Sequence, residues 1–418
     1  MNIGYACLTV GVKGTKLRSC TMKNATPDVL ETLIQSNLYV LENMLNYNIK
    51  NRIKLFRISS DIIPFGSHPV NTLNWQEKFS CQLAEIGQKA SSYNIRLSMH
   101  PGQYTVLNSP DENVVERAVD DLRYHAVFLD TMGLGKENKI ILHVGGIYGD
   151  KTAAIKRFVQ QYQRLEDNIR NRLVIENDDK QYNISDVLEI GLSQGIPVVF
   201  DSLHHEVNSE SKYSEVEWIN MCANTWKQTD GRQKLHYSQQ DSGKRPGSHS
   251  ATIDVSDFLQ FFESIKDLDV DIMAEVKDKN LSAIKCINTI SKPEIKNLEI
   301  EWSRYKYSVL EHSPNNYNKI RQILKDKTEY PVIEFYKLID EAMKTPVKPK
   351  NAVNAGQHIW GYFKDLCNDD TRKKFDKTLQ KVSTGESTIP MKRLLLKMAE
   401  EQQQKYLLES LYFMDVIN

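Results

Sequence analysis

The sequence has little cysteine and no long apolar run. None of its cysteines forms a C-x-x-C pair, which argues against a structural zinc site and against a disulfide framework. No stretch is apolar enough to suggest a membrane span, and Met1 leads into an apolar strand rather than a basic, signal-like segment. We therefore expect reduced thiols and a soluble, cytoplasmic protein. The cysteines are Cys7, Cys20, Cys81, Cys222, Cys286 and Cys367.

An excess of charge of one sign is also missing. The chain carries 54 Lys and Arg against 54 Asp and Glu, so its formal net charge is zero. Overall charge therefore neither predicts nor excludes a nucleic-acid partner, because a neutral protein can still carry a local basic channel. At 418 residues the chain is longer than a compact domain of roughly 250–300 residues. We expect a core domain followed by a second domain.

Short apolar runs alternate with longer amphipathic segments through the first 290 residues. The apolar runs predict β-strands and the amphipathic segments predict α-helices. The predicted strands cover residues 3–7, 53–59, 95–99, 139–144, 173–177, 197–200, 234–238 and 271–276. The predicted helices cover residues 27–48, 75–93, 111–132, 151–168, 184–192, 215–225 and 255–265.

This alternation predicts an α/β fold, a (β/α)8 TIM barrel, whose active site lies at the carboxyl ends of its parallel strands. A doubly wound open sheet is the alternative, but no G-x-G-x-x-G turn follows the first strand. Beyond residues 291–293 the strand pattern stops, and helices are predicted at 299–310, 316–327 and 331–343, with more after the proline-containing linker 344–350. We therefore place a TIM-barrel domain at residues 1–295 and an all-α domain at residues 296–418. A basic run at 371–377 is more typical of a solvated helix face than of a phosphate-binding patch.

Six consecutive predicted strands carry an ionisable residue at or near the carboxyl end. An isolated histidine in an apolar strand is usually a hydrogen-bonded core residue, but six such residues in register indicate a shared site. Imidazole and carboxylate ligands without thiolate are typical of zinc, manganese, cobalt or iron. The six residues are His100, His143, Glu176, Asp201, His236 and Glu275.

Two histidines in the predicted loops of the same face, His204 and His249, extend this set. Eight ligands suffice for two or three divalent ions, and Glu176, in the middle of the strand order, is the natural bridge between them. Such ions activate water and stabilise charge on phosphoryl or sugar oxygens. His205 directly follows His204, and from the spacing alone either histidine of this irregular loop can face the metal.

Two further residues need a separate interpretation. His125 lies inside a predicted helix, so we expect a solvent-facing or packing residue rather than a ligand. Lys234 precedes His236 by two residues, so both side chains point into the barrel. A lysine among metal ions must be paired, neutral or chemically modified.

The predicted loops display residues that a metal site does not explain. Gln103 and Tyr104 follow a rigid Pro-Gly turn, His68 lies in the loop after the second strand, and Tyr5 lies on the first strand. Amide and aromatic side chains on a rigid rim can enter a stacked duplex and hold displaced bases. Equally, Tyr104 can simply cover its own loop.

Residues 1–290 resemble the ultraviolet-damage endonucleases, which are metal-dependent (β/α)8 repair enzymes related to endonuclease IV. The matching motifs span the barrel and include MHPGQY at 99–104, LVIENDD at 173–179, VFDSLHH at 199–205, LHYS at 235–238 and MAEVKDK at 273–279. The resemblance implies a nuclease that acts on double-stranded DNA. Its cut would lie immediately 5′ to a cyclobutane pyrimidine dimer, a 6-4 photoproduct or an abasic site, and the enzyme would gather at the nucleoid during repair.

The resemblance also implies roles for individual residues. The eight candidate ligands would bind two or three ions, manganese first and zinc, cobalt or magnesium as alternatives, with His204 favoured over His205. Gln103 and Tyr104 match the pair that probes the lesion. Tyr5 and His68 would line the damage pocket. The residues expected to take part in catalysis are Glu176, Lys234, His236 and Glu275, of which the lysine can be carboxylated in this family.

One departure from the family pattern concerns the first strand. Many members carry an asparagine shortly after the first-strand tyrosine, where this chain has Leu8-Thr9-Val10. Pocket contacts on that side are therefore not carried over.

Residues from about 299 onward resemble another family, a helical domain of unknown function seen in YbgA-like proteins. The matching stretches are RYKYSVLEHSPNNY at 304–317, NAGQHIWGYFK at 354–364 and IPMKRLLLK at 389–397. The resemblance implies no chemistry and no obligate protein partner. Docking of DNA or of another protein is the hypothesis for this domain.

Two other functions stay open. A metal-dependent sugar isomerase or epimerase of the xylose-isomerase-like type also gathers Glu, Asp and His around its ions. It would not need Gln103 and Tyr104 on the rim, nor the extra ligands His204 and His249. A non-catalytic damage-binding protein would leave the ligands idle.

Overall fold

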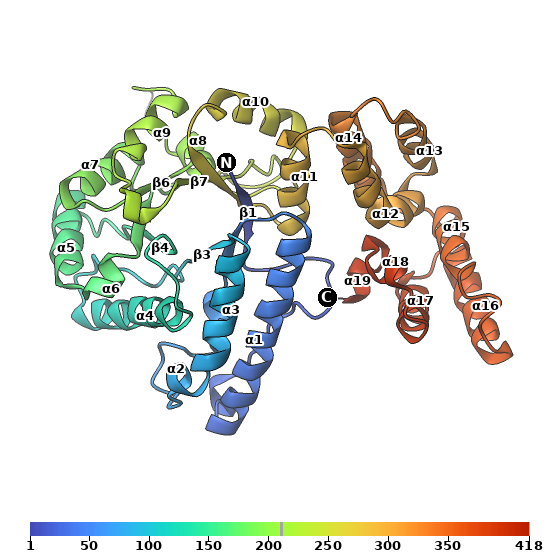
Figure 1. The fold of residues 1–418 in the computed structure, drawn as a ribbon, viewed down its shortest axis with the longest axis horizontal. Helices are drawn as coiled ribbons and strands as arrows, with labels where there is room; N and C mark the ends of the chain where they lie inside the picture. Colours follow the sequence, from blue (N-terminus) through green and yellow to red (C-terminus); the bar gives the residue numbers. More distant parts are fainter. Residues whose placement is uncertain (210–211, 418) are drawn as a thin grey trace. The chain divides into compact units, whose positions relative to one another are not determined.

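The computed structural model describes residues 1–209 and 212–417, and its β-strands close into one parallel barrel in sequence order (Figure 1). The strands are β1 (Ile3–Ala6), β2 (Leu55–Ile58), β3 (Arg96–Met99), β4 (Lys139–His143), β5 (Leu173–Glu176), β6 (Val198–Asp201), β7 (Gln233–Tyr237) and β8 (Val270–Ala274). Every predicted strand is present with both ends within about two residues. The predicted TIM barrel is confirmed, and the open-sheet alternative is wrong because β1 pairs with both β2 and β8.

Helices follow the strands where the amphipathic segments predict them, and two further helices that were not predicted follow the sixth and the eighth strand. The helices are α1 (Pro27–Lys50), α2 (Trp75–Lys78), α3 (Ser80–Ser92), α4 (Glu112–Thr131), α5 (Lys151–Arg164), α6 (Asp167–Arg170), α7 (Ile184–Gln194), α8 (Ser202–Val207), α9 (Glu215–Ala223), α10 (Val255–Ile265) and α11 (Asn280–Ile290), with 3-10 turns η1 (Met22–Asn24), η2 (Ser60–Ile62) and η3 (Gln228–Asp230). Two predicted helices are divided. The segment 75–93 breaks at Phe79, and the segment 151–168 breaks where Leu165 adopts an extended conformation.

Side chains along each strand alternate between the barrel interior and the surrounding helices, as the period of two requires. In the interior, Ile141, Val174 and Val199 form an apolar layer from three neighbouring strands. The next inward-facing position on each of these strands is the ligand candidate at its carboxyl end. The strand register therefore decides which polar residues meet above the apolar layer.

The described chain divides into two compact units. Unit 1 comprises residues 1–9, 14–253 and 260–287, and unit 2 comprises residues 10–13, 254–259 and those from 288 onward. This division falls a few residues before the boundary expected at 296, and the two functional domains stay a prediction. Within the described residues, no helix is both long enough and apolar enough to cross a membrane.

Unit 2 is helical, as predicted for this part of the chain. Its elements are α12 (Ile295–His312), α13 (Pro314–Ile323), α14 (Val332–Lys344), α15 (Pro349–Trp360), α16 (Asp369–Ser383), α17 (Ile389–Glu401), α18 (Lys405–Leu408), η4 (Leu411–Phe413) and α19 (Met414–Ile417). Its buried core includes Ile359, Phe363 and Leu395. The basic run at 371–377 lies on α16, where Arg372 and Lys373 are exposed.

Candidate functional site

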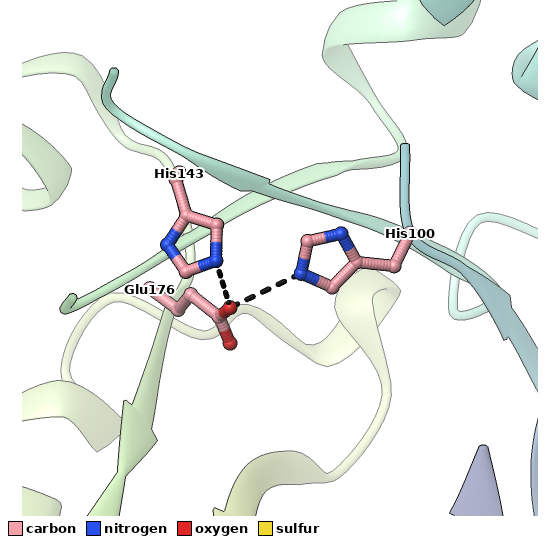
Figure 2. Close-up of side chains that lie close together, drawn as sticks. All are labelled: His100, His143 and Glu176. Atoms are coloured by element: carbon pink, nitrogen blue, oxygen red, sulfur yellow. Dashed lines mark hydrogen bonds and ion pairs between the residues drawn. The ribbon is translucent and has the colours of Figure 1, made fainter. Parts of the chain in front are cut away.

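Glu176 lies at the centre of a cluster of imidazoles and carboxylates at the carboxyl ends of the strands. It ends β5 and is buried. Its Oε1 lies 3.1 Å from Nε2 of His100 and 2.8 Å from Nε2 of His143, and Figure 2 shows both rings directed at this oxygen. Its Oε2 lies 2.5 Å from Nδ1 of His236. One carboxylate therefore joins imidazoles from three strands.

Two more carboxylates approach His236 from the neighbouring strands. Asp201 is its Cα partner across β6 and β7, and Oδ2 of Asp201 lies 3.9 Å from Nδ1 of His236. Glu275 directly follows β8, and its Oε1 lies 3.2 Å from the same nitrogen. The structure thus brings together all six residues that the strand ends pointed to.

The segment after β6 is helical rather than an irregular loop, which corrects the expectation for this region. Asp201 caps the short helix α8, since its Oδ1 accepts a hydrogen bond from the backbone N of His204 at 2.8 Å. The ring of His204 lies 5.8 Å from that of His143, between centroids. His205 instead packs against Phe200 in the buried layer. The cap therefore turns His204 towards the cluster and His205 away from it.

His249 reaches the cluster from the long loop between β7 and α10. Its ring centroid lies 6.4 Å from that of His204, and its Nδ1 contacts the main-chain oxygen of Glu275. This contact leaves Nε2 as the nitrogen available to a ligand.

Neighbouring cationic groups hold the carboxylates of Glu176 and Glu275 in the ionised form, whereas burial raises the pKa of Asp201. Burial alone would raise the pKa of Glu176, but His236 and His143 outweigh it and hold this pKa well below its ordinary value. Burial likewise opposes ionisation of Glu275, and the Arg57 guanidinium lowers its pKa below the ordinary range.

The imidazoles themselves differ in their protonation. Burial lowers the pKa of His100. For His204, burial is outweighed by Asp201 and Glu176, which raise its pKa to about 9. A cluster that attracts protons to this extent also attracts metal cations, which compete for the same nitrogens.

The residues at this site fit divalent metal ions. Two sets of ligand atoms each lie within 4.8 Å of one another, namely His100, His143 and Glu176, and Glu176, Asp201 and His236. Among the residues that the structure describes, Oε2 of Glu176, Oδ2 of Asp201 and Nδ1 of His236 are buried without a hydrogen-bond partner. Each such atom costs about 1–3 kcal/mol, and cations between these oxygens and nitrogens would offset that cost. Because Glu176 belongs to both sets, the site could hold two ions that share this carboxylate.

The sequence interpretation missed Arg57, a buried arginine on β2. One terminal nitrogen of Arg57 lies 2.9 Å from Nε2 of His236 and donates a 2.5 Å hydrogen bond to Oε1 of Glu275. Arg57 therefore orients two candidate ligands at once. A signal for it was present, because an arginine inside the apolar run 53–59 must have a buried partner.

Lys234 lies in the barrel interior on β7, two residues before His236. It is almost fully buried, and its Nζ has no hydrogen-bond partner in the described parts of the chain. Burial, with Arg96 and Arg57 nearby, lowers its pKa well below the ordinary value. Of the three states expected for Lys234, the paired one is therefore wrong, and the neutral and modified states stay open.

His125 is a packing residue, which is one of the two roles expected for it. It is fully buried on α4, and its ring nitrogens lie 2.6 Å from the main-chain oxygen of Asp121 and 2.8 Å from Oγ of Ser60. The solvent-facing alternative is wrong.

The rim residues Gln103 and Tyr104 line two different hollows. Gln103 lines a pocket of about 300 Å3 together with His100, His143 and His204. Tyr104, which is 72% exposed, lines a cleft of about 910 Å3 together with His68. The loop after β3 is thus a ridge between the candidate metal site and the larger cleft.

Tyr5 does not line a pocket, which corrects the role expected for it. It is completely buried, its ring packs 5.1 Å from that of Phe56, and its hydroxyl donates to Oδ1 of Asn48 in α1 at 2.9 Å. The period of two explains this, because Gly4 and Ala6 face the barrel interior and Tyr5 faces the helices. Leu8, at the position where the chain departs from the family pattern, is 49% exposed.

Comparison with known proteins assigns residues 1–303 to the model of the UV-endonuclease UvdE family. The chain is 42% identical to the UV DNA damage endonuclease of Clostridium perfringens over 351 residues, which are 83% of this chain and 84% of the relative. It is 34% identical to that of Bacillus pumilus over 271 residues, which are 64% of this chain and 85% of the relative. The chain belongs to the UV-endonuclease UvdE family.

A solved structure supports the barrel of this UvdE family member. The crystal structure of SacUVDE is 39% identical, aligns with a TM-score of 0.65, and matches 69% of this chain and 98% of SacUVDE. Residues 306–415 match the model of a protein family of unknown function, DUF1722. Both resemblances found in the sequence are confirmed.

Proposed function

We propose that this protein is a DNA repair endonuclease that cuts the backbone immediately 5′ to cyclobutane pyrimidine dimers and 6-4 photoproducts, and also acts at abasic sites. The observation that carries the proposal is the convergence of imidazoles and carboxylates on Glu176, in a chain 42% identical to a relative named UV DNA damage endonuclease. The substrate is double-stranded DNA, which the protein would bind in the cytoplasm, at the nucleoid.

The eight candidate ligands would hold two or three divalent ions, manganese first and zinc, cobalt or magnesium as alternatives. When bound, such ions activate water and neutralise charge on the scissile phosphate. Glu176 belongs to both sets of close ligand atoms, which supports its role as the shared carboxylate. The ligands are His100, His143, Glu176, Asp201, His204, His236, His249 and Glu275.

The chain's own residues fix the geometry of this site. Arg57 holds Glu275 and His236 in place, since it contacts both. Lys234 lies beneath His236 without a hydrogen-bond partner in the described residues, which is compatible with a carboxylated or neutral side chain that supports the ligands. Glu176, Lys234, His236 and Glu275 are the residues that we propose for catalysis.

Lesion recognition falls to the rim. Tyr104 is exposed on the ridge beside the larger cleft, so its ring can stack on a displaced base, a contact worth about 1–3 kcal/mol. Gln103 faces the pocket of the candidate ligands and can hydrogen-bond a base edge. His68 lines the same cleft as Tyr104.

A single assay tests the function. An end-labelled, ultraviolet-irradiated duplex is incubated with the protein, with and without a chelator, beside the same duplex unirradiated. A nick 5′ to the dimer that requires metal supports the nuclease. Binding of the damaged duplex without a nick would instead support a damage-binding module, and neither binding nor nicking would favour the sugar isomerase or epimerase.

For the helical residues 296–418 we propose only an accessory role, in docking DNA or another protein. The test is a chain that ends near residue 296. If it binds and incises lesion DNA like the full chain, this role is contradicted.

A further inference from the structure

We propose that Asp121, in α4, is a positioning residue for lesion recognition. Its carboxylate ties the loop after β2 to the loop after β3, and so sets the shape of the cleft between His68 and Tyr104. This inference rests on the proposed function, because it gives that cleft the lesion as its occupant.

The tie consists of two hydrogen bonds to one buried carboxylate. Oγ of Ser67 donates to Oδ1 of Asp121 at 2.8 Å, and Oγ1 of Thr105 donates to Oδ2 at 2.6 Å. Asp121 is 2% exposed. Hydrogen bonds to an ionised acceptor in a buried setting are stronger than those between neutral groups. Each carboxylate oxygen is thus used by a different loop.

The loop after β2 needs this support, because its backbone is held in an unfavourable conformation. Phe65 has φ of 56°, in the left-handed region that a bulky residue rarely adopts. Gly66 lies flat against the ring of Tyr124, where an added Cβ would come within 2.4 Å of a ring carbon. The contacts from α4, including the bond from Ser67, hold the loop in this conformation and thereby place His68.

The loop after β3 is anchored one residue away from its exposed tip. Thr105 is 2% exposed, whereas the neighbouring Tyr104 is 72% exposed. The backbone N–H of Thr105 donates to the main-chain oxygen of Gly102 at 2.9 Å, which closes the turn. With its hydroxyl fixed on Asp121, Thr105 becomes the fixed base from which Tyr104 projects.

A second contact of α4 serves the candidate ligands rather than the cleft. His125 lies 2.8 Å from Oγ of Ser60, and this hydroxyl donates to the main-chain oxygen of His100 at 2.8 Å. Asp121 approaches this second contact only through its Oδ2, which lies 3.9 Å from Nδ1 of His125, farther than the two hydroxyls that it binds in the cleft loops. Its loss should therefore disturb the cleft more than the ligands. This separation makes the role of Asp121 testable.

The experiment compares Asp121→Ala with Asp121→Asn in the full chain. The dissociation constants for irradiated and undamaged duplex are measured, together with KM and kcat for incision. For Asp121→Ala we expect the ratio of the two affinities to fall about tenfold and KM to rise by a similar factor, with kcat within about threefold. Asp121→Asn should restore most of the ratio, because its amide can accept from one hydroxyl and donate to the other.

Two further variants control for loss of stability. Asp130→Ala removes a different carboxylate of α4, one that bonds Arg172 at 2.6 Å, and should leave the affinity ratio unchanged. Thr105→Val keeps the side-chain shape and removes one donor, so it should lower the ratio about threefold. Thr105→Val therefore tests whether the bond to Asp121 affects lesion recognition, even if Asp121→Ala fails to fold.

An unchanged affinity ratio in folded Asp121→Ala, or in Thr105→Val, would overturn the inference, as would an equal loss in Asp130→Ala. Wild-type protein that does not prefer irradiated duplex would instead contradict the proposed function itself. The two failures are therefore distinguishable.

Discussion

Both ends of the barrel interior hold buried charge, but the two ends differ in how it is paired. At the end away from the strands' carboxyl ends most charges have a partner, although Lys234 has no hydrogen-bond partner among the described residues. Away from the strands' carboxyl ends, Nζ of Lys139 lies 2.5 Å from Oδ1 of Asp230, and Arg96 pairs with Asp271 at 3.5 Å. At the carboxyl ends, Oε2 of Glu176 and Nδ1 of His236 lie 2.5 Å apart without hydrogen-bond geometry in the described structure.

This difference separates a structural cluster from a functional one. Buried polar atoms are almost always hydrogen-bonded, since each unsatisfied atom costs free energy. Ion pairs whose donor and acceptor atoms are bonded to each other therefore require no ligand. Ligand atoms that converge and stay without a hydrogen-bond partner, as Oε2 of Glu176, Oδ2 of Asp201 and Nδ1 of His236 do among the described residues, leave room for a cation. That arrangement, rather than the mere number of charges, marks the site.

The largest effect is expected from Glu176→Gln. It removes the charge shared by both ligand sets, so incision of irradiated duplex should fall more than about 100-fold, while most of the DNA affinity stays. Nicking rate and dissociation constant are measured on the same preparation. Full nicking activity in this variant would refute the role of Glu176.

Arg57→Met should have the next largest effect. It removes the group that orients His236 and lowers the pKa of Glu275, so metal affinity should fall about 10–100-fold. Metal titration followed by incision activity measures this change. Arg57→Lys keeps the charge and should lose less, and metal affinity equal to wild type in Arg57→Met would remove Arg57 from the site.

Tyr104→Ala should weaken recognition of the lesion about tenfold, because one base-stacking contact is lost. Metal affinity should not change, since Tyr104 lies on the far side of the ridge from the ligand pocket. The dissociation constants for irradiated and undamaged duplex measure this change. Tyr93→Ala, which removes another exposed tyrosine, is the control. Equal lesion affinity in Tyr104→Ala would leave Tyr104 as a cover for its own loop.

The smallest effect on activity is expected from Lys139→Met, which changes an ion pair away from the carboxyl ends of the strands. Leaving Asp230 without its buried partner should lower the free energy of unfolding by about 3–5 kcal/mol. Incision by the folded variant should match wild type within about twofold, because the pair lies outside the site. Chemical denaturation and nicking assays measure the two quantities. A variant that loses incision but keeps its stability would show that the Lys139–Asp230 pair serves activity rather than stability.

Much of the fold and of the ligand cluster could be predicted from the sequence. The strand runs are bounded by turn signals, and the ligand candidates end those runs, so their register followed from the period of two. The same period places Tyr5 outside the barrel, since it alternates with Gly4 and Ala6, whereas the role implied by the family resemblance requires a residue that lines a pocket.

Other features could not be predicted, because they depend on contacts between distant segments. The capping by Asp201 that separates His204 from His205 needs the end of β6 to be known to within one residue. The partner of Arg57 comes from β8, and the partners of Asp121 come from two loops. The pattern of one segment carries no information about such partners.

We expect the metal ions at the carboxyl ends of the strands, around Glu176. Counting bound ions per chain with native mass spectrometry, in wild type, Glu176→Gln and Lys139→Met, measures this. We predict two or three ions in wild type and in Lys139→Met, and at least one fewer in Glu176→Gln. An unchanged count in Glu176→Gln, or a loss of ions in folded Lys139→Met, would show that the ions do not bind around Glu176.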